Sequence, residues 1–285
     1  MSKLFSGLEA FGLGKLEKMN VYEEDTQKKN GPEGQEVKAE KKELTEADML
    51  FDKTYTCPVC DKEFQSKSIR IGKVKLLSAD TDLRPKYQNV DSLKYDALVC
   101  PHCGYASLSR FFNFMLPAQA KMIKEQISAN FKGIEIKGDY YTYDEAIARH
   151  KLALACTVAK KARTSERAYT CLKLAWLCRG KAESLSKDTK DYDEVIKELQ
   201  EEEKELLENA FEGFDHAYSR ESFPMCGMDE LSVMYLMADL ARRVGRYDEA
   251  GRYISKVLTS RNANTRIKNK AREIKELIQA EKGEA

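Results

Sequence analysis

The sequence has no run of about 20 consecutive apolar residues, the length that a membrane-spanning helix needs, so we expect no transmembrane segment. It also has almost no excess of one charge: 48 Lys and Arg face 47 Asp and Glu, which gives a formal net charge of +1. No global field therefore draws the chain to nucleic acid or to an anionic membrane. The N-terminal residues lack the unbroken apolar core and the cleavage site of a secretory signal, so we predict a cytoplasmic protein.

Common catalytic signatures are missing as well, since GxxxxGK[ST], GxSxG, HExxH and a GxGxxG after a strand are all absent. The three histidines are scattered: His102, His150 and His216. His150 shares a helical face with two alanines, which is typical of a core histidine rather than a ligand. Asp80 and Asp82 could serve acid–base chemistry, but carboxylates in a turn with Arg84 more often make local hydrogen bonds and ion pairs. We therefore predict a protein that is not an enzyme.

What the sequence does contain is two matched turns, Cys57-Pro58-Val59-Cys60 and Cys100-Pro101-His102-Cys103. Each turn directs two thiolates to one point, and two such turns supply the four soft ligands of a tetrahedral zinc site. Gly104 follows the second turn, where a positive φ is often needed. The 39 residues between the turns exceed the usual roughly 15–20, so we expect a folded insertion. We predict one structural Zn²⁺ per chain, bound by these four cysteines.

Other interpretations of these cysteines are weaker. Four reduced thiols without metal would not need two matched turns, and a thioredoxin-like site would need one CxxC at a helix start in a βαβ pattern. Four bound thiolates leave no open coordination position, so hydrolytic chemistry is not expected. His102 could replace one cysteine, but the four already complete the site, and we expect it to point to solvent or a neighbour. The remaining cysteines fall in helical patterns and are predicted to be small buried side chains of a protein in a reducing compartment: Cys156, Cys171, Cys178 and Cys226.

The chain divides into four parts. Residues 1–21 carry apolar side chains at spacings of three to five, a glycine-weakened amphipathic pattern that we interpret as a docking segment. Its target stays open: the protein's own body, a partner or a membrane surface. Residues 22–49 are charged and poor in large apolar groups, which predicts a disordered linker. Residues 50–110 form the zinc module, and residues 111–285 are predicted to be helical.

Within the zinc module, residues 64–77 are rich in β-branched and basic side chains and predict one or two strands around Gly72. Residues 80–85 predict a loop, and residues 95–99 a short strand before the second turn. In the helical part, Pro117 opens a helix to about residue 131, and Thr142 with Glu145 forms a capping box. Further helices are predicted at 165–181, 191–220, 229–243, 247–260 and 264–281, with Asp191 as a second cap.

Two of these helices repeat a pattern. Ala210, Phe214 and Ala217 follow the small–aromatic–small spacing of the second helix of a tetratricopeptide (TPR) unit, and Ala250 begins a later copy. The copies lie 40 residues apart instead of 34, so the units would be divergent. The predicted fold is mainly α: a small β-containing zinc-ribbon-like module followed by a TPR-like α-helical hairpin array.

The order of segments resembles a known family. FDKTYTCPVC, SIRIGKVKLL, DTDLRPKY and LVCPHCGYA, followed by helical repeats, are similar to the bacterial domain-of-unknown-function family numbered twenty-two twenty-five. The similarity covers about residues 45–260, and the two CxxC turns are its most specific part. The resemblance implies a zinc-ribbon-like module fused to TPR-like helices, and it implies no reaction.

Two functions are consistent with these features. The first is a zinc-binding interaction or adaptor protein, whose helical array holds a protein or peptide partner. The alternative is a nucleic-acid-binding module that uses a basic strip with nearby rings. That strip would consist of Arg70, Lys73, Lys75, Arg84 and Lys86, with Tyr87 and Tyr95. The first function is preferred, because the total charge is neutral and such strips are usually solvated faces.

Overall fold

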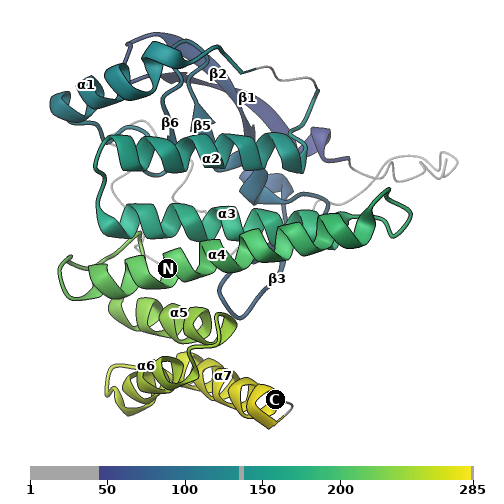
Figure 1. Cartoon of the computed structure of the whole chain (residues 1–285), viewed down its shortest axis with the longest axis vertical. Coiled ribbons are helices and arrows are strands. Elements are labelled where there is room, and N and C mark those ends of the chain that lie inside the picture. The colour runs from purple at the N-terminus through teal and green to yellow at the C-terminus, as the bar shows by residue number, and fades with distance from the viewer. Residues whose placement is uncertain (1–44, 135–137, 284–285) are drawn as a thin grey trace, which may run out of the picture. The chain divides into compact units, whose positions relative to one another are not determined.

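The computed structural model describes residues 45–134 and 138–283, and this part of the chain is mainly helical with three short antiparallel strand pairs (Figure 1). The predicted fold class, mainly α with a small β module, is confirmed. The described residues form one compact unit. The predicted docking segment 1–21 and most of the linker 22–49 lie outside the described residues. In the described ranges, no helix has both the length and the apolar content that a membrane span requires.

Residues 45–49 belong to the segment that the sequence predicts as a linker, yet they are folded onto the body. Ala47–Met49 form the 3₁₀ turn η3, and Met49 is buried. The Glu46 carboxylate accepts a hydrogen bond of 2.6 Å from the Tyr95 hydroxyl and lies 2.7 Å from Lys94 Nζ. The folded body therefore starts before residue 50, because this short segment forms hydrogen bonds and an ion pair with residues that lie far along the chain.

Three antiparallel hairpins make up the β structure: β1 (Leu50–Thr56) with β2 (Glu63–Ile69), β3 (Leu76–Ala79) with β4 (Pro85–Tyr87), and β5 (Ala97–Val99) with β6 (Ala106–Leu108). β2 and β3 lie on either side of Gly72, as predicted. The strand predicted from residue 95 begins only at Ala97. The reason is that Ser92–Tyr95 form the 3₁₀ turn η5, in which Asp91 accepts a hydrogen bond of 3.0 Å from the backbone N–H of Leu93.

The α-helices of the described residues follow in order: α1 (Pro117–Gln126), α2 (Tyr143–Ala159), α3 (Thr164–Ser184), α4 (Tyr192–Tyr218), α5 (Glu230–Arg243), α6 (Tyr247–Thr259) and α7 (Thr265–Gly283). From α3 onward their limits agree with the predicted ranges to within three residues. The first helix is shorter than predicted. It ends at Gln126, and the 3₁₀ turn η6 (Ser128–Asn130) follows.

The predicted helix caps have different outcomes. Thr142 and Glu145 form the expected capping box: the Thr142 hydroxyl accepts from the N–H of Glu145 at 3.2 Å, and the N–H of Thr142 donates to the Glu145 carboxylate at 2.8 Å. The predicted cap at Asp191 is wrong. Asp191 adopts a left-handed conformation with φ 57° and makes no capping hydrogen bond through its side chain. Gly245, with φ 78°, forms the turn between α5 and α6.

Each helix from α2 onward packs on the next one along the chain, and α7 also returns to α5 (Figure 1). The side chains that define the predicted repeat are all buried in this helical core: Ala210, Phe214, Ala217, Ala250, Ile254 and Val257. Small residues let the helices approach closely, while Phe214 fills the gap between them. A TPR-like class for this array remains a prediction. At its start, α2 packs on β5 and β6, so the hairpin with the second cysteine pair rests on the first long helix.

Candidate metal centre

The two CxxC turns are the loops of two hairpins with the same backbone pattern. The first runs from β1 to β2 and the second from β5 to β6. In each loop the N–H of the first cysteine donates to the carbonyl five residues later, at 3.0 Å for Cys57 and 2.9 Å for Cys100. The carbonyl of the same cysteine accepts from the residue four positions later, Asp61 at 2.9 Å and Gly104 at 3.0 Å. The two hairpins thus present their thiols in the same way.

The fourth residue after each first cysteine has a positive φ, 58° for Asp61 and 74° for Gly104. A Cβ at position 104 would lie 2.5 Å from the ring of Phe131, whereas Asp61 is exposed. Glycine is therefore required at residue 104 by both conformation and space, as the sequence predicted. At residue 61 the conformation alone is demanding, and Asp tolerates it.

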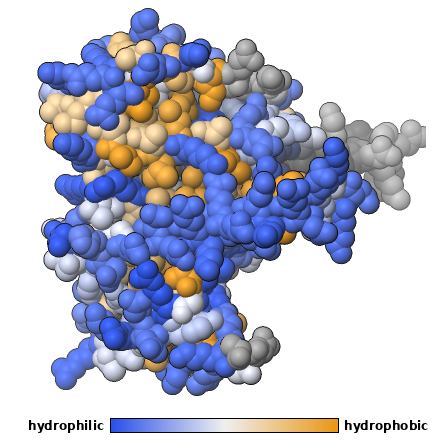
Figure 2. Space-filling model, viewed as in Figure 1, coloured by the Kyte–Doolittle hydropathy of each residue, from blue (hydrophilic) through white to orange (hydrophobic). Residues whose placement is uncertain are grey.

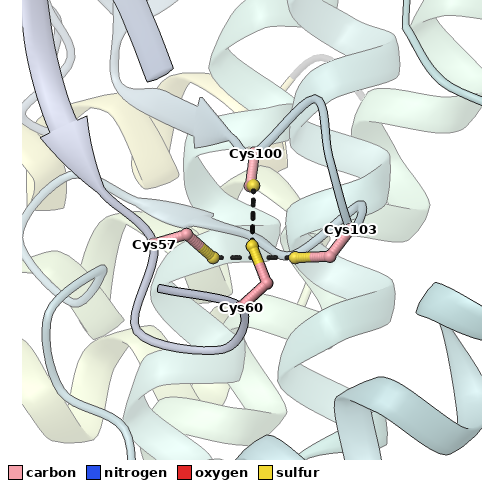
Figure 3. Close-up of side chains that lie close together, drawn as sticks. All are labelled: Cys57, Cys60, Cys100 and Cys103. Carbon is pink, nitrogen blue, oxygen red and sulfur yellow. Dashed lines mark hydrogen bonds between the residues drawn. The ribbon is translucent and has the colours of Figure 1, made fainter. Parts of the chain in front are cut away.

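The four sulfur atoms converge from the two hairpins (Figure 3). All of them lie within 4.8 Å of one another, with 3.6 Å between Cys57 and Cys103 and 3.7 Å between Cys60 and Cys100. Tetrahedral coordination with Zn–S bonds of about 2.3 Å places sulfurs about 3.8 Å apart. The spacing is far beyond that of a disulfide bond, and all four cysteines are free. The structure therefore brings the four predicted ligands together at a distance that fits one metal ion.

The thiols influence one another strongly. Hydrogen bonding to Cys100 raises the pKa of the Cys57 thiol to about 12, and it also raises the pKa of Cys103. Hydrogen bonds from Cys103 and Cys57 lower the pKa of Cys100 to about 2. These opposed shifts arise because thiols this close together cannot all ionise independently. A bound divalent cation would let all four become thiolates, because coordination deprotonates a thiol.

Aromatic rings pack in the same core cluster as the four cysteines. Phe112 is fully buried, and its ring centroid lies 5.0 Å from that of Tyr105 and 5.8 Å from that of Phe64. The Tyr105 hydroxyl donates to the Phe112 carbonyl at 3.1 Å. This apolar packing limits the access of water to the sulfurs, which favours a structural metal site over a catalytic one.

His102 is not part of the ligand set. It is exposed, and its Nε2 lies 3.1 Å from the backbone carbonyl of Glu63, the first residue of β2. The prediction that it points to solvent or a neighbour is confirmed. Because His102 belongs to the second turn and Glu63 follows the first, this hydrogen bond connects the two hairpins beside the sulfurs.

α2 holds the second hairpin through Cys156. The N–H of Ala106 donates to Cys156 Sγ at 3.4 Å, and the thiol lies 3.7 Å from the Gly104 carbonyl. Burial raises the pKa of the Cys156 thiol to about 11, so it stays protonated. Cys171, Cys178 and Cys226 are buried as well, which confirms the prediction that these four cysteines are buried side chains. The helical placement predicted for Cys226 is wrong: it lies in the turn between α4 and α5, with φ 49°.

Comparison with protein families identifies the chain. The model of the family described as "Uncharacterized protein conserved in bacteria (DUF2225)" matches residues 50–278. The protein belongs to the DUF2225 family. The resemblance seen in the sequence is confirmed; the match begins at residue 50 instead of about 45 and extends beyond residue 260 into α7. Comparisons with curated proteins and with solved structures found no match.

The DUF2225 region also contains a buried ionic cluster in which Asp80 and Asp82 act as ion-pair partners. Asp82 is fully buried, and its carboxylate accepts hydrogen bonds from Arg179 at 2.7 Å and from the Trp176 indole at 2.9 Å. Burial alone would raise the pKa of Asp82, but the hydrogen bonds and charge of Arg179 lower it below its usual range. Arg179 also contacts Asp80 at 3.1 Å. The expected local ion pair with Arg84 is confirmed for Asp80, at 3.5 Å. Asp82 instead pairs with Arg179, which is distant in sequence.

The same cluster reaches α5 through residues that the sequence did not single out. Thr81 donates to Asp239 at 2.7 Å, and the Tyr235 hydroxyl donates to the Thr81 carbonyl at 2.7 Å. Arg243 lies 3.6 Å from Asp82 and 2.9 Å from Asp239. The loop between β3 and β4 therefore connects α3 with α5, where Figure 1 shows it descending past α3 and α4. No local pattern in the sequence marks Asp239 or Arg243.

The predicted basic strip is not brought together. Arg84 is buried and lies 3.1 Å from Glu183, and Lys86 lies 3.0 Å from Asp80. Tyr95 is buried as well. Of the five predicted cations, only Arg70, Lys73 and Lys75 are exposed. The strip is thus divided between an internal ionic cluster and one surface segment.

A groove of about 750 Å³ lies between α2, α3 and α4. Its apolar lining comes from Leu154, Val158, Ala168, Cys171, Leu174 and Leu206. Lys151 and Glu202 stand at its edge and form an ion pair of 2.7 Å. Val158 is 59% exposed, although it is a large apolar side chain. Figure 2 shows apolar side chains gathered over α1 and α2, while the surface over α4 is mostly hydrophilic.

Proposed function

We propose that this DUF2225 protein is a non-enzymatic zinc-binding interaction protein: Cys57, Cys60, Cys100 and Cys103 hold one structural Zn²⁺, and the helical array binds a protein or peptide partner. The observation that carries the metal assignment is the spacing of four sulfurs from two equivalent hairpins. Four thiolates in a tetrahedral arrangement select zinc or iron. A complete thiolate set leaves no position for water, so the ion stabilises the fold and performs no hydrolysis.

The proposed partner surface is the groove between α2, α3 and α4. It combines an apolar floor with charged edges, as sites for peptides and helices do. α2 links this groove to the metal centre. Ala153 and Cys156 pack with the cysteine hairpins, while Leu154 and Val158 on another face of the same helix line the groove. In this proposal the metal fixes α2, and α2 shapes the partner surface.

Site-directed photo-crosslinking in lysate tests the partner surface. A photoreactive side chain at position 158 should capture a defined set of proteins, and one at position 116 should not, because Leu116 is similarly exposed at 65% but lies outside the groove. Val158→Glu should abolish co-purification of the captured protein, and Leu116→Glu should leave it unchanged. Equal capture at both positions, or co-purification that survives Val158→Glu, would rule out this groove.

A further inference from the structure

A second surface of the molecule combines apolar and basic side chains. Between β2 and β3 the chain passes through the 3₁₀ turn η4 (Ile71–Lys73). Ile71 is 87% exposed, the highest value among the exposed large apolar side chains of the described residues, and Leu76 and Leu77 are 55% and 59% exposed. We call Arg70, Ile71, Lys73, Lys75, Leu76 and Leu77 the 70–77 surface.

The backbone holds these apolar side chains outward. Ile69 and Val74, on either side of the turn, pack inward against a small core cluster that contains Leu50 and Tyr95. The register of β3 and β4 shifts between Leu76 and Ser78, so Leu77 is an extra residue in the strand pair. Such a bulge breaks the alternation of strand side chains, which is why two consecutive leucines both remain exposed. The exposed apolar side chains are thus a product of the fold, anchored from beneath.

All charged side chains in the segment around the 70–77 surface are basic. Residues 64–79 include Lys67, Arg70, Lys73 and Lys75 and contain no Asp or Glu. Lys67 lies 3.8 Å from Asp52. The other three have no carboxylate within ion-pair distance in the described part of the chain: Arg70 donates to the Leu50 carbonyl at 2.9 Å, and Lys73 to the Asp48 carbonyl at 3.4 Å. Among the described residues, three cations without an ion-pair partner therefore lie in the same segment as the exposed aliphatic side chains.

We propose that the 70–77 surface docks on an anionic lipid bilayer. Aliphatic side chains at the tip would enter the boundary between headgroups and acyl chains, where apolar burial is favourable. The cations around them would lie at the level of lipid phosphates, and each contributes about fivefold to binding at an anionic surface. Charge complementarity and apolar exposure thus select the same partner. A nucleic-acid site would need freely exposed rings for stacking. Tyr95 is buried, Tyr87 is half-buried, and the 37% exposed Phe51 ring already has the Arg70 guanidinium 5.4 Å from its centroid.

Vesicle sedimentation of the full chain tests the proposal. The protein should sediment with vesicles of mixed phosphatidylglycerol and phosphatidylcholine, and not with pure phosphatidylcholine. Replacing Arg70, Lys73 and Lys75 with Gln should weaken partition about a hundredfold, since three contributions of about fivefold are lost. Replacing Ile71, Leu76 and Leu77 with Ser should weaken it about tenfold or more without changing charge. The Ser variant should melt like the parent protein, because its altered side chains are exposed. The Gln variant loses the hydrogen bonds of Arg70 and Lys73 to backbone carbonyls, so its circular dichroism and melting are measured before its binding is compared.

A charge-matched control replaces Lys121, Lys190 and Lys197 with Gln; these side chains are 78%, 92% and 76% exposed and lie elsewhere in the fold. It should retain vesicle binding within about threefold. Absence of binding to anionic vesicles by the parent protein would overturn the proposal, as would equal losses in the control and in the 70–77 charge variant. Salt-sensitive retention on single-stranded DNA that only the 70–77 charge variant loses, without vesicle binding, would assign the surface to nucleic acid instead.

Discussion

At the residue scale, the proposed metal centre depends on four closely spaced thiols that cannot all become thiolates unless a cation joins them. We predict that Cys57→Ser lowers the zinc content from one ion per chain to less than about a tenth, since three ligands hold the ion much more weakly. The hairpins should unfold and most of the helical circular dichroism should remain. Elemental analysis of protein purified without chelator measures the metal. Cys171→Ser, which changes a buried cysteine of α3 outside the cluster, should keep one ion. A metal-free parent protein would contradict the assignment, and iron in place of zinc would correct its identity.

His150 gives a pH dependence to stability. Its side chain is fully buried, Nδ1 donates to the Ala146 carbonyl at 2.8 Å, and Nε2 has no partner in the described structure. Burial lowers its pKa from 6.5 to about 4, although the nearby charge of Asp96 opposes the shift. Between these values the unfolded chain binds the proton and the folded chain does not. The contribution of His150 to stability is therefore complete above pH 6.5 and is lost as the pH falls towards 4.

We predict that the parent protein loses about 2 kcal/mol more stability than His150→Asn on going from about pH 7.5 to about pH 5. Asparagine keeps a donor near the position of Nδ1 and does not titrate. Acid also weakens the bonds between metal and thiolate, but equally in both proteins, so the difference isolates the histidine. Urea unfolding at the two pH values measures it. Parallel losses in the two proteins would show that His150 is not the titrating group.

At the element scale, the β3–β4 loop joins α3 to α5 through Asp82. We predict that Asp82→Asn lowers the free energy of unfolding by about 3 kcal/mol, because Arg179 and Arg243 lose a buried charge partner. The side chain keeps its shape, so the loss measures charge and not packing. Asp52→Asn is the matched control: this carboxylate is 57% exposed and lies 3.8 Å from Lys67, and its loss should cost less than about 1 kcal/mol. Urea denaturation distinguishes the two values, and equal costs would contradict a special role for the loop.

The sequence predicted most elements but few of the contacts between them. Helix limits depend on local signals, such as the capping box at Thr142 and the glycine at residue 245. Such signals can be recognised in a single sequence. The cluster of four cysteines could be predicted equally well, because each pair is a local turn. The ionic cluster could not be predicted in this way, because Asp82 accepts a hydrogen bond from Trp176, which lies 94 residues further along the chain. The failed cap at Asp191 shows the opposite limit: a favourable residue type does not ensure the backbone conformation that a cap needs.

At the scale of the whole molecule, a net charge near zero results from basic and acidic segments that lie on different elements. The total of +1 argues against any global field. Yet every charged residue in 64–79 is basic, and residues 201–203 on α4 are three consecutive glutamates. Averaging over the chain hides this arrangement, because opposite charges lie on different elements and act only over about 10 Å in salt solution. Conclusions from composition therefore hold for the chain as a whole and not for its individual surfaces.

Local stability should also differ between parts of the body, although the described residues pack as one unit. α2 contacts β5 and β6, whereas α6 contacts α5 and α7 and is remote from the metal hairpins. We predict that removal of the metal with a chelator raises hydrogen exchange at least about tenfold in α2 and both cysteine hairpins. Exchange in α6 and α7 should change less than about twofold, because stability in a helical array is transmitted mainly between neighbours.

Exchange followed by mass spectrometry, before and after addition of chelator, measures this gradient. Cys57→Ser without chelator should reproduce the pattern, which separates loss of the metal from side effects of the chelator. Uniform deprotection of all helices would mean that the whole body unfolds as one cooperative unit. Unchanged exchange in α2 would mean that the ion stabilises only its own hairpins, and the link from metal through α2 to the groove would then be refuted. The predicted pattern lies between these two outcomes: exchange becomes faster in α2 but changes little in α6 and α7. We expect it in α2 because this helix carries Cys156 on one face and Val158 on another.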